Sequence, residues 1–272
     1  MFKYPFEILP EKRIRVIISA DAKNEADDQY AITYGLLSPS LDVVGIAAAH
    51  FSAVNPRDSV EQSYQEILLI LEKMGLSGKI PVLMGAQRGL ADENTPHESE
   101  AARFIIEQAH SEGNPLYVVC TGAITDLASA YLMDPTIGKK IKTAIWLGGN
   151  AYPKGGSEFN LMNDIAAANV IMSSNIKLWQ IPINASVCMR VGIAELIRRV
   201  SPCGEIGKYL VDQLVELSRK QEGPCEHWIM WDIAAIALLL DPHRMQYHFE
   251  NAPIIDKNMY YIPTDREHII RV

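Results

Sequence analysis

Cysteine is scarce in this chain. Only four of the 272 residues are cysteine, and no two of them form a Cys-x-x-Cys pair. This usage argues against a zinc ribbon and against a disulfide-dense secreted scaffold, so we expect free thiols in a reducing compartment and, by default, a cytoplasmic protein. The first ten residues contain no uninterrupted apolar segment, so we expect no signal peptide.

Long apolar runs and excess positive charge are also missing. The longest apolar runs, 43–49 and 233–240, are far shorter than the ~20 residues that span a bilayer, so we expect no membrane partner. The chain has 25 Lys and Arg against 33 Asp and Glu, a net charge of −8. Such a surface repels a phosphate backbone, so we expect no nucleic-acid partner. Repeats, low-complexity tracts and Gly/Ser-rich linkers are absent too, which predicts a single domain over residues 1–272.

What the sequence does contain is an alternation of short apolar runs with longer amphipathic stretches, the pattern of βαβ units. The runs are apolar almost throughout, as in strands buried on both faces of a parallel sheet. The expected strands are 14–19, 41–49, 80–84, 116–120, 143–147 and 176–183. The expected helices between them are 27–37, 59–74, 98–110, 125–133 and 164–173. We therefore predict an α/β fold with an open, mostly parallel, Rossmann-like sheet flanked by helices.

The last third of the chain has a different pattern. Helices are expected at 192–200, 204–221 and 232–240, and together they predict a C-terminal helical annex. Two short strands are expected to follow, around 245–249 and 259–262.

Polar residues follow the predicted strands at the point where each strand ends. Asp21 follows the first strand, His50 the second, Thr121 the fourth and Asn150 the fifth. Ligands of open α/β sheets bind outside the carboxyl ends of the strands. We therefore expect the chemistry of the protein on this edge of the sheet.

The segment 21–28 holds four acids: Asp21, Glu25, Asp27 and Asp28. A helix N-terminus favours a carboxylate by only ~0.3–1 kcal/mol, whereas two carboxylates ~4 Å apart repel by about 4 kcal/mol at an effective dielectric near 20. Such a cluster requires a cation, a shared proton or a wide splay. Oxygen ligands without nearby His or Cys suit Ca²⁺ or Mg²⁺ better than Zn²⁺. A solvated acidic helix cap is the equally open alternative.

Asp232 is a further acid, and it opens the apolar helix expected at 232–240, directly after Trp231. Helix capping is the simpler interpretation of this residue. The functional interpretation is that a carboxylate among aromatic side chains has little solvent and needs a partner.

At this point the chain resembles the inosine-uridine-preferring nucleoside hydrolases. Asp21 and the pair Asp27-Asp28 look like the second Asp and the terminal pair of the family's Asp-x-Asp…Asp-Asp opening. Residues 121–128 are similar to its Thr-Gly-x-x-Thr-Asn-Leu-Ala segment, 147–149 to its Met-Gly-Gly strand end, and 158–167 to its Glu-Phe-Asn…Asp-x-x-Ala-Ala block. Trp231-Asp232 stands where the family usually has His-Asp. These matches keep their order over residues 13–242.

The resemblance implies a Ca²⁺-dependent hydrolase of the N-glycosidic bond of ribonucleosides or related N-ribosides. It implies a Ca²⁺ ion held by Asp21, Asp28, the main-chain carbonyl of Thr121 and Asp232. Asp21 would also be the general base that activates the attacking water.

On the same resemblance, the ribose hydroxyls would be bound by Asp27, Glu158 and Asn160. We expect Asn150 to be a further substrate contact and Trp231 a platform on which the base stacks. We also expect a homo-oligomer, a dimer or a tetramer.

The chain departs from the family pattern at the end of the site where the base leaves. Ser19 replaces the first Asp of the opening motif, and the loop between Asp21 and Asp27 is two residues longer than usual. Trp231 replaces the His that protonates the leaving group in some members. His227, one helical turn before Trp231, is a candidate replacement acid and substrate contact.

Two other functions stay open. One is a catalytically weak, Ca²⁺-dependent sugar- or nucleoside-binding protein on the same fold, since the usual acid is missing. The other is a phosphotransferase of the haloacid-dehalogenase type, which also uses strand-end acids and Mg²⁺. That type needs a nucleophilic Asp two residues before a second Asp, and the residue two before Asp21 is Ser19.

Overall fold

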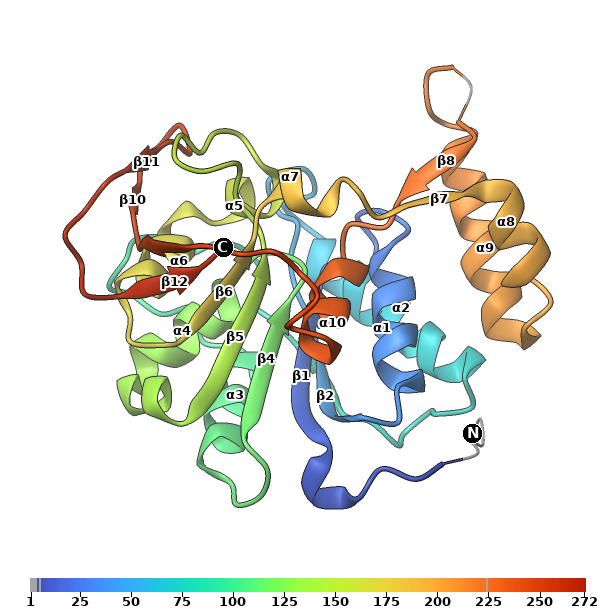
Figure 1. Cartoon of the computed structure of the whole chain (residues 1–272), viewed down its shortest axis with the longest axis horizontal. Helices are drawn as coiled ribbons and strands as arrows, with labels where there is room; N and C mark the ends of the chain where they lie inside the picture. The colour runs from blue at the N-terminus through green and yellow to red at the C-terminus, as the bar shows by residue number, and fades with distance from the viewer. Residues whose placement is uncertain (1–3, 5, 224) are drawn as a thin grey trace.

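The computed structural model of the chain describes residue 4, residues 6–223 and residues 225–272. Residues 1–3 and 5, part of the segment in which we expect no signal peptide, and residue 224 lie outside the described residues. The centre of the molecule is an eight-stranded sheet in the order β3-β2-β1-β4-β5-β6-β12-β9 (Figure 1). The first six strands are β1 (Ile14–Ala20), β2 (Leu41–Ala48), β3 (Val82–Met84), β4 (Leu116–Cys120), β5 (Ile141–Leu147) and β6 (Leu178–Ile181). Their order is that of a Rossmann sheet, and all of them pair in parallel, which confirms the predicted fold class.

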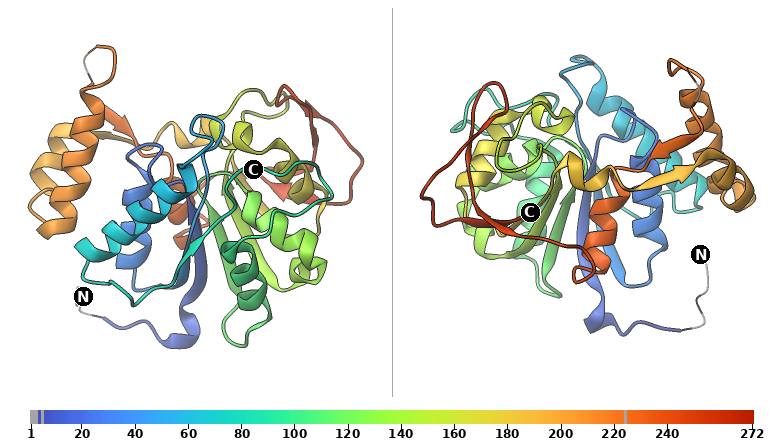
Figure 2. Two further views of the ribbon diagram at one scale, coloured as in Figure 1. Left: turned by 180° about the vertical axis from the view of Figure 1, so that it is seen from behind. Right: turned by 45° about the horizontal axis from the view of Figure 1, so that its top comes forward.

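Helices cover both faces of the sheet (Figure 2). One face carries α1 (Asp28–Leu37), α2 (Ser59–Lys73) and α10 (Ile233–Leu240). The other carries α3 (Glu100–His110), α4 (Thr125–Met133) and α6 (Ile165–Ser173). Successive residues of β1 show why its sequence is continuously apolar: Ile17 packs into the core of one face and Ile18 into the core of the other, both fully buried.

Two of these helices start where the sequence supplies a capping side chain. The hydroxyl of Ser99 accepts a hydrogen bond from the N–H of Ala102 at the start of α3, and Asp164 accepts one from Ala167 at the start of α6. These caps set the start of both helices one or two residues after the start that the apolar pattern predicts.

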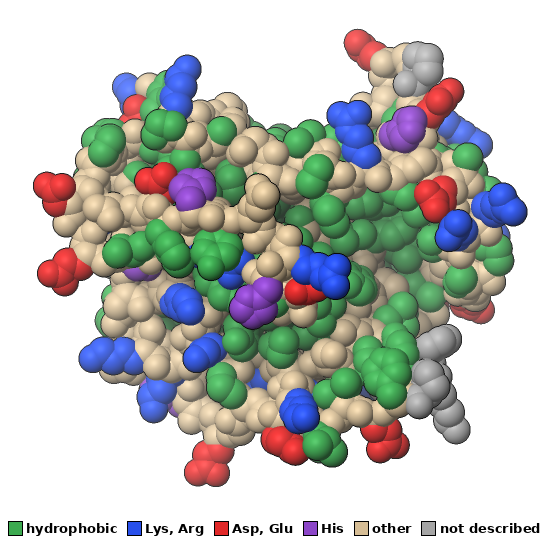
Figure 3. Space-filling model, in the orientation of Figure 1, with side chains coloured by type: hydrophobic (Ala, Val, Ile, Leu, Met, Phe, Trp, Pro, Cys, Tyr) green, Lys and Arg blue, Asp and Glu red, His purple; other side chains and the backbone are tan. Residues whose placement is uncertain are grey.

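The annex is not purely helical. It contains α8 (Ile193–Arg199) and α9 (Gly204–Ser218), as expected, and also an antiparallel pair of strands, β7 (Arg190–Gly192) and β8 (His227–Ile229). The expected third helix, α10, packs on the sheet instead of joining the annex. The annex has a core of its own, and hydrophobic side chains also gather in the hollow between it and the rest of the molecule (Figure 3).

The C-terminal segment completes the sheet. It contains β9 (Phe249–Asn251), β10 (Ile254–Ile255), β11 (Tyr261–Ile262) and β12 (Ile269–Arg271). The strand expected at 245–249 therefore begins later, and β12 was not predicted. β12 lies parallel to β6 and antiparallel to β9, and pairing with these two strands holds its three residues in the sheet. Across the described part of the chain, no helix has the length and apolar character needed to cross a bilayer.

Short helical segments occupy the connections. They are η1 (Pro10–Lys12), η2 (Pro135–Lys139), α5 (Phe159–Asn163) and α7 (Ile183–Ser186). The last two follow β5 and β6 at the carboxyl edge of the sheet, where they matter for the site.

Candidate active site

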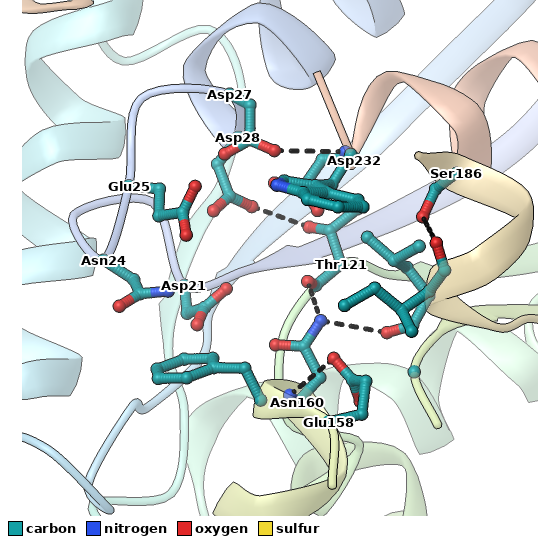
Figure 4. A pocket seen from close by; sticks show the side chains of 15 residues that line it. Asp21, Asn24, Glu25, Asp27, Asp28, Thr121, Glu158, Asn160, Ser186 and Asp232 are labelled. Atoms are coloured by element: carbon teal, nitrogen blue, oxygen red, sulfur yellow. Dashed lines mark hydrogen bonds between the residues drawn. The ribbon is translucent and has the colours of Figure 1, made fainter. Parts of the chain in front are cut away.

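A cavity of about 130 Å³ opens at the carboxyl ends of β1, β4 and β5. Its described lining has no Lys, Arg or His side chain but contributes six carboxyl groups. These belong to Asp21, Glu25, Asp27, Asp28, Glu158 and Asp232. Figure 4 shows three of the aspartates at one end of the cavity and Glu158 with Asn160 at the other. The sequence predicted a ligand site at this edge of the sheet.

Asp27 and Asp232 precede α1 and α10, but neither side chain caps its helix. Oδ2 of Asp27 instead accepts a 3.3 Å hydrogen bond from the main-chain N–H of Asp232. Asp28, the first residue of α1, accepts a 2.8 Å hydrogen bond from Oγ1 of Thr121. Carboxylate oxygens of Asp27, Asp28 and Asp232 all lie within 4.8 Å of one another. Helix capping therefore does not account for these acids.

The electrostatic environment of the cluster is unfavourable to negative charge. Burial raises the pKa of Asp28 to about 7. Burial, together with the charges of neighbouring aspartates, raises the pKa values of Asp21, Asp27 and Asp232 well above the ordinary range. A bound cation would reverse these shifts, because an opposite charge nearby favours the ionised carboxylate.

The donors present fit a hard divalent cation. Oδ2 of Asp21 is buried and has no hydrogen-bond partner among the residues that the structure describes. A set of carboxylate and carbonyl oxygens suits Ca²⁺ or Mg²⁺. The close cluster contains the expected ligands Asp28 and Asp232 but has Asp27 as its third member, whereas Asp21 lies beside it. The carbonyl of Thr121 accepts a 2.7 Å hydrogen bond from Nδ2 of Asn160 and keeps a second lone pair for a cation.

The opposite wall is fixed by main-chain contacts. The carboxylate of Glu158 accepts hydrogen bonds from the N–H groups of Gly149, Asn160 and Leu161, at 2.7, 3.0 and 2.9 Å. The amide of Asn160 also donates to the carbonyl of Leu147, at 2.9 Å. Both side chains are therefore held in place before any ligand arrives, which lowers the entropic cost of binding.

Gly122 sets the position of Asp21. A Cβ atom at residue 122 would lie 2.8 Å from Oδ1 of Asp21, closer than real Cβ contacts allow. Nε1 of Trp146 donates a 3.2 Å hydrogen bond to the carbonyl of Gly122 and so restrains the main chain at this residue. The glycine of the 121–128 motif is thus required by the close approach of a site carboxylate.

Glu66, a buried residue of α2, holds the long loop between Asp21 and Asp27 in position. Oε2 of Glu66 lies 2.7 Å from Nζ of Lys23, and Oε1 accepts hydrogen bonds from Tyr209 and Gln29. Nε2 of Gln29 also donates to the carbonyl of Ala22, at 2.5 Å. Since Tyr209 lies on α9, the annex takes part in holding this loop.

Two predicted contacts lie outside the cavity lining. The side chain of Asn150 is engaged with Ser157 and with the N–H of Ala151. His227 is an exposed residue of β8 in an outer groove next to the cavity. The expected helical relation between His227 and Trp231 is wrong, because residues 227–229 pair as a strand with β7. Trp231 itself lines the cavity.

Several lining residues were not predicted from the sequence as metal or substrate contacts. Asn24 and Glu25 reach the cavity from the long loop, Phe159 from α5, and Ile183 and Ser186 from α7. The unusual length of the loop was the available signal for Asn24 and Glu25. Ile183 and Ser186 had no such signal, because a short apolar segment after a strand is compatible with many structures.

His50 lies behind the site instead of lining it. It is fully buried, and its Nε2 is 2.8 Å from Oγ1 of Thr125, which in turn donates to Asp164 at 2.7 Å. The N–H and hydroxyl of Ser52 lie against Nδ1. These contacts fit a neutral imidazole with its proton on Nε2.

The chain is similar in sequence and in fold to known nucleoside hydrolases. Uridine nucleosidase 1 of Arabidopsis thaliana is 25% identical over 227 residues, which cover 74% of this chain and 66% of that protein. The pyrimidine-specific ribonucleoside hydrolase RihB of Escherichia coli is 25% identical over 225 residues, 72% of this chain and 68% of that protein. A solved plant nucleoside hydrolase, the PpNRh1 enzyme, has the same fold with a TM-score of 0.75, at 21% identity and over 97% of this chain and 94% of its own.

These names support N-glycosidic bond hydrolase activity, and the resemblance expected from the motifs is confirmed. The family model for inosine-uridine preferring nucleoside hydrolases matches residues 16–264. The chain therefore belongs to the inosine-uridine preferring nucleoside hydrolase family.

Proposed function

We propose that this protein is a Ca²⁺-dependent hydrolase of the N-glycosidic bond of ribonucleosides or related N-ribosides. The observation that carries the proposal is the cavity with six carboxyl groups, of which the Asp21 carboxylate has a buried oxygen without a partner within the described chain. Cleavage of an N-glycosidic bond passes through an oxocarbenium-like sugar, and fixed carboxylates stabilise its positive charge.

Each wall of the cavity has a role in this proposal. Asp27, Glu158 and Asn160 bind the ribose hydroxyls and hold the sugar against the acid cluster. Asp28, Asp232 and the carbonyl of Thr121, together with Asp21, hold the cation, and the position of Asp27 within 4.8 Å makes it a further candidate ligand. When bound, Ca²⁺ supplies a Lewis acid that lowers the pKa of water and orients the sugar diol.

Asp21 is the general base that accepts the proton of the attacking water. Water attacks C1′ of the ribose while the bond from C1′ to the base nitrogen breaks, and its electron pair leaves with the base. The proton of the attacking water passes to Asp21, whose buried Oδ2 has an open acceptor position. The base leaves as an anion and takes a proton from solvent, to which Asp21 releases its own, so the products are free ribose and the neutral base.

The direct test is an assay of the purified protein with Ca²⁺ against a panel of nucleosides, scored for free ribose. We expect release of ribose that stops when a chelator is added. A folded, Ca²⁺-loaded protein that releases no ribose from any nucleoside or from an activated riboside contradicts the proposal.

One observation favours the binding-protein alternative. Among the described residues of the lining there is no His, Lys, Tyr or Cys that could protonate a departing base, and Trp231 stands where the family has its acid. A Ca²⁺-dependent binding protein on the same fold would retain ligand without releasing ribose. Equilibrium binding of a nucleoside with no turnover over many hours distinguishes this function from hydrolysis.

We also propose that the protein is cytoplasmic and homo-oligomeric, a dimer or a tetramer. The four cysteines are free, in keeping with a reducing compartment. Phe249, on the edge strand β9, and Ile269, on the adjacent strand β12, expose 65% and 58% of their surface. Exposed apolar edges favour association, and light scattering of the purified protein tests it.

A further inference from the structure

The lining of the cavity carries more negative charge than one bound divalent cation would neutralise. A divalent cation neutralises two of the six carboxylates, and the described lining supplies no basic side chain for the others. Four of the acids are buried aspartates around the cation cluster, and Glu158 is held by main-chain N–H groups. Glu25 differs from them because its side chain is exposed at the mouth of the cavity and forms no ion pair with another residue that the structure describes.

Glu25 lies at the junction of two spaces. Asn24, Glu25 and Trp231 line both the inner cavity and an outer groove of about 560 Å³. Figure 4 shows Glu25 directed toward the acid cluster from the side of the long loop. In the proposed function a ribose held by Glu158 and Asn160 would fill the small inner cavity, so its base would extend toward the outer groove, at the junction lined by Glu25 and Trp231.

The way in which the C1′–N bond breaks indicates which charge the base should carry. A neutral base leaves with the electron pair of the C1′–N bond and becomes an anion unless a proton is supplied. A base whose ring nitrogen is already quaternary takes the same pair and leaves neutral. For such a riboside the balance is riboside cation and water giving ribose, neutral base and one proton, which Asp21 accepts. No leaving-group acid is needed.

We propose that this site selects ribosides whose base carries a fixed positive charge, such as N-ribosyl pyridinium compounds, and that Glu25 and Trp231 recognise that charge. The inference rests on the proposed function and names its substrate class. Glu25 attracts the cation electrostatically, and the indole face of Trp231 adds a cation–π contact. The longer loop of this chain is what brings Glu25 to the junction.

The test compares pyridinium-3-carboxamide riboside, a cation, with uridine, which is neutral. Their kcat/KM ratio is measured for the parent, for Glu25→Gln and for the control Glu112→Gln, which removes an exposed carboxylate near the opposite edge of the sheet. The intrinsic reactivity of the two compounds is the same in all three proteins, so a change in the ratio reports Glu25 alone. We expect the ratio to fall about tenfold in Glu25→Gln and to stay unchanged in the control.

Binding of two unreactive probes gives a second readout that needs no turnover. Nicotinamide and its N-methylpyridinium cation differ by one methyl group and one charge. We expect the cation to bind the parent more tightly, with the preference reduced in Glu25→Gln and with a dependence on salt that nicotinamide lacks.

Three results overturn the inference: an unchanged ratio in Glu25→Gln, equal binding of the two probes, or a larger loss for uridine than for the cation. The last result would make Glu25 a proton donor to the leaving group. Release of no ribose from either riboside contradicts the proposed function instead, and the probe binding then decides the charge preference by itself.

Discussion

The main-chain N–H of Asp232 donates a hydrogen bond to the carboxylate of Asp27, across 205 residues of sequence. This contact joins the first turns of α1 and α10, which pack against each other on one face of the sheet. Both helices therefore direct their N-termini, the positive ends of their dipoles, toward the acid cluster. The dipoles offset part of the repulsion among the carboxylates, and a bound cation would offset the rest.

The first prediction is that the acid cluster binds a divalent cation. Adding Ca²⁺ at about 100 times its dissociation constant should stabilise the protein by about 2.7 kcal/mol. Asp232→Asn should lose most of this gain, and the control Asp212→Asn, on the exposed side of α9, should keep it. Thermal unfolding with and without Ca²⁺ measures the effect. Protein purified without chelators that contains no stoichiometric Ca²⁺ or Mg²⁺, and whose unfolding is indifferent to Ca²⁺, rules the site out.

The second prediction concerns Asp21. Asp21→Asn should reduce kcat by ~10²–10⁴-fold, the typical contribution of a general base, while the protein stays folded. The amide can still accept a hydrogen bond but cannot take a proton. Single-turnover rates on the Ca²⁺-loaded variant check this, with circular dichroism as the control for folding. A variant that keeps more than about a tenth of the parental kcat removes Asp21 from the mechanism.

The third prediction follows from the described lining, which has no His, Lys, Tyr or Cys side chain to protonate the leaving group. p-Nitrophenyl riboside leaves as a stable phenolate and should be hydrolysed at least ~10² times faster than inosine. Because His227 lies on β8 outside the cavity, His227→Ala should change neither rate. If inosine matches the activated riboside in the parent and slows alone in His227→Ala, the acid was relocated to His227 and the prediction is wrong.

The fourth prediction concerns the fastening of the long loop. Glu66→Gln removes the ion pair with Lys23 and weakens the hydrogen bond from Tyr209. We expect a loss of about 1–3 kcal/mol in the free energy of unfolding and a loss of about tenfold in Ca²⁺ affinity, since the loop carries Asp21 and Asp27. Glu72→Gln, on an exposed position of the same helix, is the matched control. Equal Ca²⁺ affinity in the two variants would show that the loop does not depend on Glu66.

The fifth prediction is a pH dependence of stability that originates at His50. Burial, together with the charge of His97, lowers the pKa of His50 to about 4, whereas an unfolded histidine has a pKa near 6.5. Between these values the unfolded chain binds the proton and the folded chain does not. The stabilisation is therefore complete above pH ~6.5 and falls by about 3 kcal/mol as the pH decreases toward 4.

Denaturant unfolding of the parent and of His50→Gln, measured from pH 4.5 to pH 7, isolates this contribution. The parent should show the steeper slope, by up to about 1.4 kcal/mol per pH unit. Parallel curves for the two proteins would assign the acid sensitivity to other groups.

Most of the sheet could be predicted because its strands are buried on both faces. Ile17 and Ile18 point to opposite cores, so the apolar run that contains them has few alternatives to a central parallel strand. Asp21 and Thr121 could be placed at the site for the same reason, since each directly follows such a strand. The position of a residue at a strand end is encoded locally.

The parts that could not be predicted depend on distant partners. Strand β12 has three residues and exists through its pairing with β6 and β9, which leaves no local pattern. The strand containing His227 was not predicted, and His227 was instead expected one helical turn before Trp231, because its pairing with β7 connects residues 39 positions apart, such as Arg190 and Ile229. Asn24 and Glu25 reach the cavity because α2 and α9 hold their loop, and a sequence motif does not encode such support.

The meeting of α1 and α10 also bears on how the protein folds. The first of these helices begins at Asp28 and the second at Ile233, so most of the chain must be in place before the acid cluster exists. A cation that binds the cluster has no equivalent site in a partly folded chain, where these acids are far apart. Affinity for the cation should then appear last during refolding, and the ion would stabilise the completed structure without nucleating its formation.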